Sequence, residues 1–479
     1  MPNPSVTTQV KALVIGAGVS GLVCAHALRK AGIDVLLVEA SDRAGGAIQT
    51  KRRDGYLLEI GPQSFTGTSE LFELFADLKI ENEIVEAPAK APRYVLIDGK
   101  LRAVPMSPPS FLTSNLVSFG TKLSIARDLL GKTQPPDHDE SVADFVRRKF
   151  SGELLDRLVG PFVSGVYAGD PERLSLRSAF PTLYRAEKGS GSVIRGSIRN
   201  AKAEAKSSGT IDASDRARRG RTLLNFREGT ETFTRALANQ LGDRFRPNTN
   251  VTNIVNLPSG SERRFSVKVR VENSGGQTED ILADELVVAT PADVGAYLVR
   301  SLSGQMSFDL SQIEWTPIAV VSLGYPRQAV GDPLRGFGFL VPRSAGVRLL
   351  GTVWNSSLFP DRAPEDHVLL TSFVGGATDP EVLDLSEDEL ATLVDRELGP
   401  IIGIKSGSNR YSFSNTTIYS SALPQYNVGY AERLWSIEQA RVAIANLTLV
   451  GNYLRGPSIG ACVQHALSAA QEIISRKNR

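Results

Sequence analysis

The stretch ALVIGAGVSGLVCAHALRKAGIDVLLVE, from Ala12 to Glu39, contains the pattern that decides the fold. Gly16, Gly18 and Gly21 form a GxGxxG motif after a short apolar run, and the acid lies eighteen residues after the last glycine. The apolar run predicts a buried parallel strand, the helical spacing of the residues that follow predicts a helix, and a second apolar run predicts a strand that ends at the acid. This order of elements is the context in which the motif binds a dinucleotide.

The motif residues have separate physical roles in such a site. Gly16 permits the tight turn, Gly18 leaves room for a pyrophosphate, and Gly21 lets the helix pack on the strand. The helix N-terminus adds free N–H groups and the positive end of its dipole. Glu39 can accept hydrogen bonds from ribose hydroxyls and disfavours a 2′-phosphate, which leaves NAD and FAD open. The predicted cofactor-binding set also includes the neighbours Ser20 and Ala40.

The residues after the acid separate these two cofactors. The string EASDRAGGAIQT places Arg43, Gly45 and Gly46 just past Glu39, where an arginine can meet a pyrophosphate and paired glycines allow a close approach of the backbone. This string resembles the extended signature of FAD-binding oxidoreductases of the amine oxidase type. The Gly-Pro turn in LEIGPQSF resembles the segment that passes the flavin in these proteins, and it adds Gly61, Pro62, Gln63 and Ser64 to the predicted site.

Two later segments fit the same architecture. NTNVTNI resembles the strand whose valine, here Val251, covers the adenine, and LVGNYLRGPSIGACVQHA resembles the C-terminal segment that contacts the flavin. The second segment adds Gly451, Ile459 and Cys462, although Ala461 stands where these proteins more often have an acid. No cysteine motif for covalent flavin attachment is present, so the resemblance implies non-covalent FAD.

Composition narrows the class of protein. A chain of 479 residues with 41% hydrophobic and 22% charged residues is typical of a soluble protein of two or three domains. A formal net charge of +2 does not favour nucleic acid as a partner. Two cysteines and four histidines without ligand spacing predict neither a metal site nor a disulfide framework. The N-terminus does not resemble a secretory signal, and no stretch reaches the roughly 18 apolar residues of a membrane span.

Several segments resemble the protoporphyrinogen IX oxidase family over nearly the whole chain. They are GPFVSGVYAGDPERLSL (160–176), PRYVLIDGKLRAVPMSPPSFL (92–112), GFGFLVP (336–342) and LPQYNVGY (423–430). The resemblance implies the six-electron oxidation of protoporphyrinogen IX to protoporphyrin IX. It also implies hydride transfer to flavin N5 and O2 as the electron acceptor.

The family resemblance assigns candidate substrate residues. Arg93 matches an arginine that meets a propionate of the tetrapyrrole, while Leu340 and Phe359 match an apolar pair that encloses a ring. Gly165 matches a glycine whose carbonyl faces the substrate near the flavin, and it is the one residue predicted to be catalytic. Gly169 belongs to the same turn. A large apolar substrate with two carboxylates needs such aliphatic walls and a cation.

The predicted fold is α/β, with three parts. A Rossmann-like FAD-binding domain of the glutathione reductase and amine oxidase type is expected from residues 1–90, 222–300 and 424–479. An α+β substrate-binding domain with a mixed sheet is expected from residues 91–100 and 301–423, and a helical, membrane-associating domain from residues 101–221.

An apolar helical stripe suggests the membrane contact. Leu112, Leu116, Phe119, Leu123, Ala126 and Leu130 recur at helical spacing. Ten Lys or Arg residues against four Asp or Glu residues between Arg185 and Arg221 add a local basic excess, and the polar segment 202–221 predicts an exposed loop. We expect a cytoplasmic protein bound peripherally to the cytoplasmic face of a membrane.

Other functions remain open at this point. Coproporphyrinogen III, with four carboxylates, is the nearest alternative substrate, although one pocket cation fits two carboxylates better. An amine oxidase or carotenoid desaturase would keep the fold, but the sequence contains no clear aromatic cage or flavin-side lysine. A non-catalytic FAD-fold carrier is disfavoured by the intact glycines. A homodimer and a transient contact with a downstream chelatase are further open partners.

Overall fold

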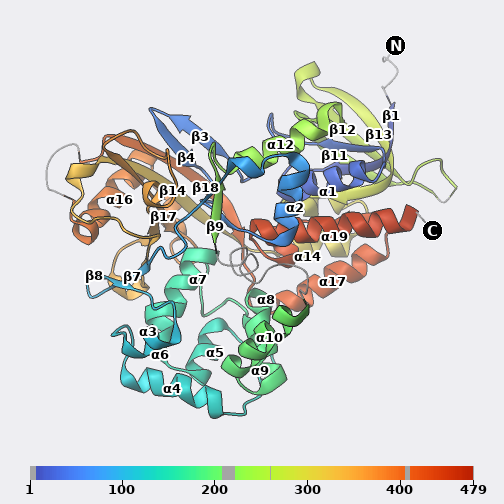
Figure 1. Ribbon diagram of the computed structural model, residues 1–479. Helices are drawn as coiled ribbons and strands as arrows, with labels where there is room; N and C mark the ends of the chain where they lie inside the picture. Colours follow the sequence, from blue (N-terminus) through green and yellow to red (C-terminus); the bar gives the residue numbers. More distant parts are fainter. Residues whose placement is uncertain (1–6, 208–221, 259, 405–409, 478–479) are drawn as a thin grey trace.

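The computed structural model describes residues 7–207, 222–258, 260–404 and 410–477. Figure 1 shows two sheets side by side, with a helical region below them and both β1 and α19 in the part that contains the first sheet. The first sheet is the one that contains the glycine motif.

The predicted strand, helix and strand at the N-terminus are confirmed. Strand β1 (Thr7–Ile15) runs into helix α1 (Val19–Lys30), which leads to β2 (Val35–Val38). Strand β1 is central and parallel to both β2 and β13 (Gln277–Val288). The sheet continues with β10 (Phe245–Arg246), β11 (Thr249–Asn256), β12 (Phe265–Val271) and β19 (Leu447–Leu449).

Helices cover this sheet because its parallel strands are apolar on both faces. Helix α1 packs against the C-terminal helix α19 (Ile459–Lys477), and α12 (Glu231–Leu241) lies beside α1. The other helices of this part are α2 (Ser69–Leu78), α13 (Ala292–Val299), α14 (Gly304–Ser311), α17 (Tyr430–Val442) and α18 (Asn452–Arg455).

The second sheet has the order β18-β14-β17-β16-β15-β7-β8. Its strands are β7 (Arg93–Ile97), β8 (Lys100–Ala103), β14 (Trp315–Pro326), β15 (Gly338–Leu340), β16 (Leu349–Val353), β17 (His367–Gly375) and β18 (Phe413–Pro424). Alternate residues of β14 face opposite sides. Ala319 and Val321 join the core under α16 (Glu387–Ile402), whereas Ile318 and Val320 pack near Ala168 of the helical region. One face of this sheet is therefore turned toward the helical region.

Small elements connect the two sheets. They are the hairpin β3 (Thr50–Arg53) and β4 (Tyr56–Glu59), the strands β5 (Phe65–Thr66), β6 (Ile84–Glu86) and β9 (Leu223–Phe226), and the short helix α15 (Asn355–Leu358).

The helical region differs from the single apolar stripe that the sequence predicts. Helices α3 (Pro108–Thr113) and α4 (Phe119–Leu130) are separate, because the side chain of Ser118 caps α4. Leu116 lies between them and is buried. The remaining helices are α5 (Val142–Lys149), α6 (Gly152–Leu154), α7 (Gly160–Tyr167), α8 (Leu176–Ala179), α9 (Pro181–Ser190) and α10 (Val193–Ser207).

Two further expectations concern this part of the chain. The predicted loop 202–221 is wrong at its start, because α10 continues to Ser207, and residues 208–221 lie outside the described part. Within the described ranges, no helix has both the length and the apolar character to cross a membrane.

Candidate functional site

The glycine turn at the end of β1 is closed on one side and open on the other. Gly16 has a φ of +102°, and a Cβ there would lie 2.8 Å from the carbonyl oxygen of Ala289. A Cβ on Gly21 would lie 1.9 Å from the carbonyl oxygen of Gly16, so α1 packs directly on the turn. At Gly18 no atom lies within 4 Å of an added Cβ. A ligand can therefore approach the helix N-terminus at Gly18, as the motif predicts.

A second glycine turn lies against the first. The N–H of Gly45 donates to the carbonyl of Ala17 at 2.8 Å, and a Cβ on Gly46 would lie 3.2 Å from Cα of Gly18. Both glycines have positive φ, at +115° and +57°. The two predicted cofactor segments thus form one continuous backbone surface.

Arg43 holds this second turn. Its guanidinium donates to the carbonyls of Ala44 at 2.9 Å, Ile48 at 3.2 Å and Gly46 at 2.5 Å, and it lies 3.9 Å from the carboxylate of Glu231. A planar fork of donors suits several carbonyls at once. Arg43 therefore fixes the shape of the surface around the glycines.

Glu39 lies at the end of β2 with its carboxylate oriented by the backbone. One oxygen accepts a hydrogen bond from the N–H of Ala17 at 2.7 Å, and the other accepts from the N–H of Ser41 at 2.9 Å and its hydroxyl at 2.8 Å. The carbonyl of Glu39 accepts from Thr249 N–H at 2.8 Å, which brings the buried Val251 of β11 to this edge. Ala40 is the exposed neighbour of Glu39.

The C-terminal segment reaches the same edge of the sheet. The N–H of Val450 donates to Val288 at 3.0 Å, so Gly451 lies beyond the end of β19, and Ile459 begins α19. Cys462 on α19 meets the buried Ser20 of α1. Burial raises the pKa of the Cys462 thiol to about 11 despite the hydrogen bond with Ser20. The thiol is therefore neutral near pH 7.

The Gly-Pro turn, Gly61 and Pro62, follows the hairpin of β3 and β4 and also reaches the site. A Cβ on Gly61 would lie 1.9 Å from the carbonyl of Ala47, next to the second glycine turn, so Gly61 and Pro62 lie against it. Ser64 follows, partly buried. The side-chain amide of Gln63 donates to the carbonyls of Glu59 at 2.9 Å and Gly61 at 3.0 Å. These contacts connect every predicted cofactor segment through the carboxyl ends of β1, β2, β13 and β19, an arrangement that fits an extended dinucleotide cofactor.

The buried Glu59 was not predicted from the sequence. Its carboxylate accepts four hydrogen bonds: from Thr50 at 2.8 Å, from Asn225 at 2.9 Å, and from the hydroxyl and N–H of Thr230 at 2.6 and 3.0 Å. Burial nevertheless raises its pKa. The acid inside the apolar run YLLEI was the available signal, because an acid is rarely buried without partners.

Asn355 and Arg362 were missed as well. Asn355 Nδ2 donates to Gln63 Oε1 at 2.8 Å and so attaches α15 to the Gly-Pro turn. Arg362 is buried and donates to the carbonyls of Phe226 at 2.9 Å and Arg227 at 3.1 Å. Burial lowers its pKa, although Glu59 opposes this. Only the fold brings these residues to the site.

Two predicted substrate residues touch each other. A Cβ on Gly165 of α7 would lie 2.3 Å from Cδ2 of Leu340 on β15. The same methyl group lies 3.0 Å from the position of a Cβ on Gly351 of β16. Helix α7 therefore approaches the second sheet closely where Leu340 points, and a side chain at position 165 would displace the end of the Leu340 side chain.

Arg93 begins β7 and is exposed, opposite Gly338 in the parallel ladder with β15. Its guanidinium carbon lies 5.7 Å from the ring centre of Phe337, and within the described ranges its side chain has no ion pair or hydrogen bond. Phe337 packs in one cluster with Phe359, which is 3% exposed. The guanidinium carbon of Arg362 lies 5.5 Å from the centre of the Phe359 ring.

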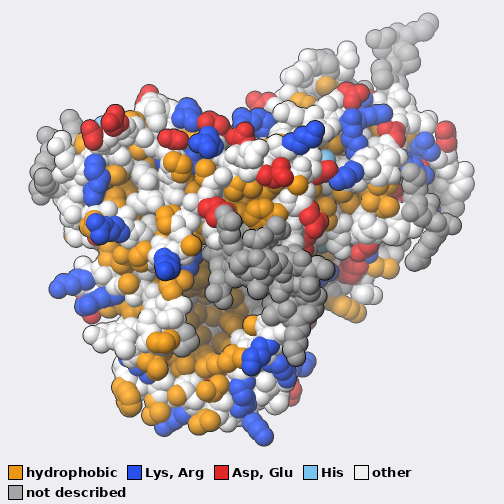
Figure 2. All heavy atoms as spheres, in the orientation of Figure 1, with side chains coloured by type: hydrophobic (Ala, Val, Ile, Leu, Met, Phe, Trp, Pro, Cys, Tyr) orange, Lys and Arg blue, Asp and Glu red, His pale blue; other side chains and the backbone are white. Residues whose placement is uncertain are grey.

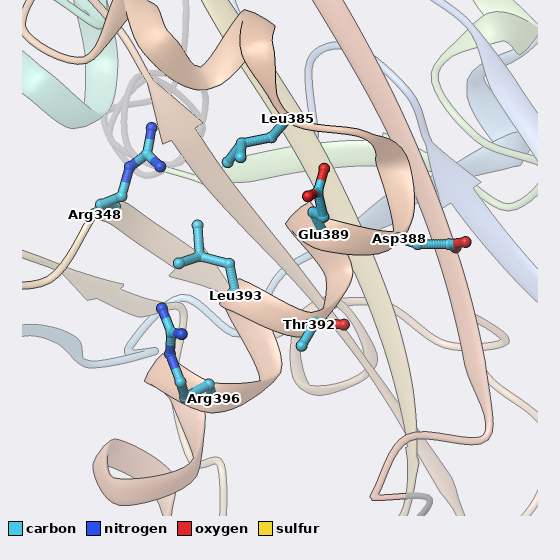
Figure 3. Close-up of a pocket in the computed structure, with 7 residues that line it drawn as sticks. All are labelled: Arg348, Leu385, Asp388, Glu389, Thr392, Leu393 and Arg396. Atoms are coloured by element: carbon cyan, nitrogen blue, oxygen red, sulfur yellow. The ribbon is translucent and has the colours of Figure 1, made fainter.

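Gly169 is buried just after α7, and a Cβ there would lie 2.9 Å from Gln425 Oε1. Figure 2 shows a hollow between the helical region and the sheets, with hydrophobic side chains on its visible wall. A separate groove on the outer side of the second sheet is lined by Arg348 and residues around α16, which Figure 3 shows. None of the predicted site residues lines that groove. The described residues contain no cluster of side chains that could hold a metal ion.

Residues 19–474 match the model of the flavin-containing amine oxidoreductases. The chain belongs to this family. A chloroplast protoporphyrinogen oxidase of Nicotiana tabacum is 34% identical over 478 residues, which cover 97% of this chain and 85% of that protein. The coproporphyrinogen III oxidase of Staphylococcus aureus is 29% identical, with 96% of this chain and 98% of that protein covered. The predicted resemblance to the protoporphyrinogen oxidases and the assignment to the oxidoreductases are confirmed.

The fold agrees with the family. A crystal structure of a protein from Exiguobacterium sp. 255-15 has a TM-score of 0.77 to this chain at 23% identity, and the match covers 98% of this chain and 99% of that one. The chain thus has the amine oxidase type of flavin-binding fold with mixed α/β sheets. Membership in a flavin-containing family also identifies a flavin as the cofactor.

Proposed function

We propose that this protein is an FAD-dependent oxidase that converts protoporphyrinogen IX to protoporphyrin IX with O2 as electron acceptor. The observation that carries the proposal is the match over nearly the full length to oxidases of that name. The contact between Gly165 and Leu340 beside the strand of Arg93 supports it, because it brings together residues that the family resemblance predicts for one substrate.

The chain's residues have distinct roles in this reaction. Arg93 binds a propionate of the substrate, and its exposed guanidinium has no competing carboxylate among the described residues. Leu340 and Phe359 contact the apolar ring system, and the backbone at Gly165 directs one ring carbon to the cofactor. FAD supplies the hydride acceptor when it is bound. The oxidised product is aromatic, so the site needs orientation and exclusion of water more than a strong base.

The FAD is proposed to be non-covalent. Burial raises the pKa of Cys462 to about 11 and that of Cys24 to about 12, so neither thiol is a nucleophilic thiolate near pH 7. Release of the flavin from acid-precipitated protein would test this. A flavin that stays with the pellet would contradict it.

Peripheral attachment to the cytoplasmic face of a membrane is also proposed. Helices α3 and α4 expose Leu112, Phe119, Leu123 and Leu130, and Figure 2 shows hydrophobic side chains gathered on this part of the surface. Such a surface fits a lipid boundary next to an apolar substrate.

Coproporphyrinogen III oxidation to coproporphyrin III is the second candidate. It is favoured by the match to coproporphyrinogen III oxidases of Staphylococcus aureus and Bacillus subtilis at 29% and 28% identity. The two substrates differ in the number of cationic side chains that they need, since coproporphyrinogen III has four carboxylates and protoporphyrinogen IX has two.

Anaerobic mixing of the purified protein with each porphyrinogen tests both candidates. Protoporphyrinogen IX should bleach the flavin absorbance, and porphyrin fluorescence should appear when O2 is admitted. Faster bleaching by coproporphyrinogen III would favour the second candidate, and no bleaching by either would refute the proposed function. In the Arg93→Ala variant the KM should rise more than kcat falls. An unchanged KM would remove Arg93 from the site.

A further inference from the structure

Gln425 and Tyr426 lie where the two sheets and the helical region meet. They directly follow β18 of the second sheet. The carbonyl of Tyr426 accepts a hydrogen bond from Ser175 N–H at 2.8 Å, and Val428 N–H donates to the carbonyl of Arg173 at 2.9 Å. This pairing attaches the dipeptide to the helical region, just after α7.

Gln425 holds the end of α7. Its side chain is buried, and its Nε2 donates to the carbonyl of Tyr167 at 2.9 Å and to the hydroxyl of Thr316 at 3.2 Å. Tyr167 is the last residue of α7, where helical carbonyls have no partner within the helix. The same helix carries Gly165 at its contact with Leu340. Gln425 therefore caps the last carbonyl of the substrate-side helix.

Tyr426 reaches the flavin-side segment instead. Its hydroxyl donates to the carbonyl of Asn452, between β19 and α19. Its ring lies 6.0 Å from the ring of Tyr167 and 4.9 Å from that of Tyr430. The hydroxyl of Tyr430 donates to the next carbonyl, that of Tyr453, at 2.7 Å. Two neighbouring carbonyls of this segment are thus held by two tyrosines whose rings are in contact.

We propose that Gln425 and Tyr426 are positioning residues that set the distance between α7 and the flavin-side segment. The inference rests on the proposed function, in which α7 presents the porphyrinogen carbon and residues 451–453 support the flavin. The side chain of Gln425 bonds to the end of α7, and that of Tyr426 bonds to the flavin-side segment. The distance between α7 and that segment therefore depends on the one peptide unit that joins the two residues and on their two side chains. A misplacement of about 1 Å between reacting atoms can cost about a hundredfold in rate.

The local packing supports a fixed spacing. A Cβ on Gly169 would lie 2.9 Å from Gln425 Oε1, and the Ala168 carbonyl accepts from Ala377 N–H at 2.7 Å. The end of α7 is therefore held by the second sheet and by the dipeptide at once. The side chain of Gln425 is thus packed directly against the turn that follows α7.

Stopped-flow reduction of the flavin by protoporphyrinogen IX tests the inference. Tyr426→Phe and Gln425→Leu should each lower the limiting rate of flavin reduction about tenfold or more, while the half-saturating concentration changes less than about twofold. The double variant should lose less than the product of the two single effects, because both act on one distance. Tyr325→Phe is the control, since it removes a buried hydroxyl bond to Asp395 of 3.0 Å on the far side of the second sheet. It should leave the rate unchanged.

Unchanged reduction rates in both single variants, or effects that multiply, would overturn the inference. The wild-type reaction reports on the proposed function separately. Hydrogen exchange of the holoenzyme tests the spacing without any substrate. Tyr426→Phe should raise exchange both in peptides from residues 160–169 and in peptides from residues 450–456, and Tyr325→Phe in neither. Faster exchange in residues 450–456 alone would mean that the two side chains act independently, and the inference would fail.

Discussion

Helices α1 and α4 are both twelve residues long, yet they bury opposite kinds of side chain. Helix α1 buries Leu22, Val23 and other small or apolar residues against the first sheet. Helix α4 buries Thr121 and Asp128. It leaves Phe119 80% exposed and Leu130 83% exposed. A helix that buries polar side chains and exposes apolar ones is the reverse of the usual pattern, and it fits the membrane contact proposed above.

Buried charges hold α4 in this orientation. Asp128 lies 2.6 Å from Lys149 Nζ, and its other oxygen accepts from Ser192 at 3.0 Å and from Ile194 N–H at 3.1 Å. Burial raises the pKa of Asp128, but these hydrogen bonds outweigh it, so the pKa lies below its usual value. Lys149 also lies 3.3 Å from Glu187. The inner face of α4 is thus polar, and its buried carboxylate is paired with a buried cation.

The largest expected effect concerns α1, the helix that buries its apolar side chains. In Gly21→Ala the new Cβ would lie 1.9 Å from the carbonyl of Gly16, so α1 must move off the glycine turn. We expect FAD affinity to fall at least about a thousandfold, or about 4 kcal/mol. Flavin absorbance after gel filtration and titration with FAD measure this. Gly304→Ala, where nothing lies within 4 Å, is the control. Normal flavin content in Gly21→Ala would contradict the packing argument.

The buried charges under α4 give the next effect. Asp128→Leu leaves Lys149 with one acidic partner instead of two and should lower the free energy of unfolding by about 3 kcal/mol. Denaturant unfolding followed by circular dichroism measures this. Asp128→Leu combined with Lys149→Met should recover most of the loss. A single variant as stable as the wild type would mean that the charges do not hold α4.

The outer face of α4 should behave in the opposite way. Phe119→Ser with Leu130→Ser should change stability by less than about 0.5 kcal/mol, because both side chains are exposed. The same variant should bind anionic vesicles at least about tenfold more weakly, since two apolar side chains no longer enter the lipid. Flotation measures the binding. Trp435→Ser on α17, at 67% exposure, is the matched control and should bind as the wild type does. Equal binding of both variants would remove α4 from the membrane contact.

The smallest effect concerns His465 on α19, which packs beside α1. Burial, and then the charge of Arg455, lower its pKa to about 4, while Glu438 opposes the shift. The unfolded chain therefore takes up this proton near pH 6.5, before the native protein does, and stability is lost as the pH falls from about 6.5 to 4. At pH 5.5 the lowered pKa of His465 reduces the free energy of unfolding by about 1 kcal/mol. His465→Gln should show a shallower loss of stability over this range, measured by unfolding at several pH values. An identical pH profile would contradict the assignment.

The candidate site could be predicted from sequence where its chemistry depends on backbone shape. Gly16, Gly21 and Gly61 were predictable because a side chain at each would collide with a nearby carbonyl. Glu59 and Arg362 were not, since their burial depends on Thr230 and Phe226, far away in the chain. The single helical stripe was also wrong, because periodicity does not register the cap at Ser118.

The sequence by itself determined the glycine turn after β1, the flavoprotein family and the candidate residues, because local backbone constraints and motif spacing are encoded within short segments. Tertiary structure decided which of those residues meet. The contact of Gly165 with Leu340 joins segments that no periodicity relates, and the Gln425–Tyr426 junction joins three parts of the molecule. It also decided that α4 faces outward, because the choice depends on charges supplied by α5 and α9 rather than on the residues of α4 alone.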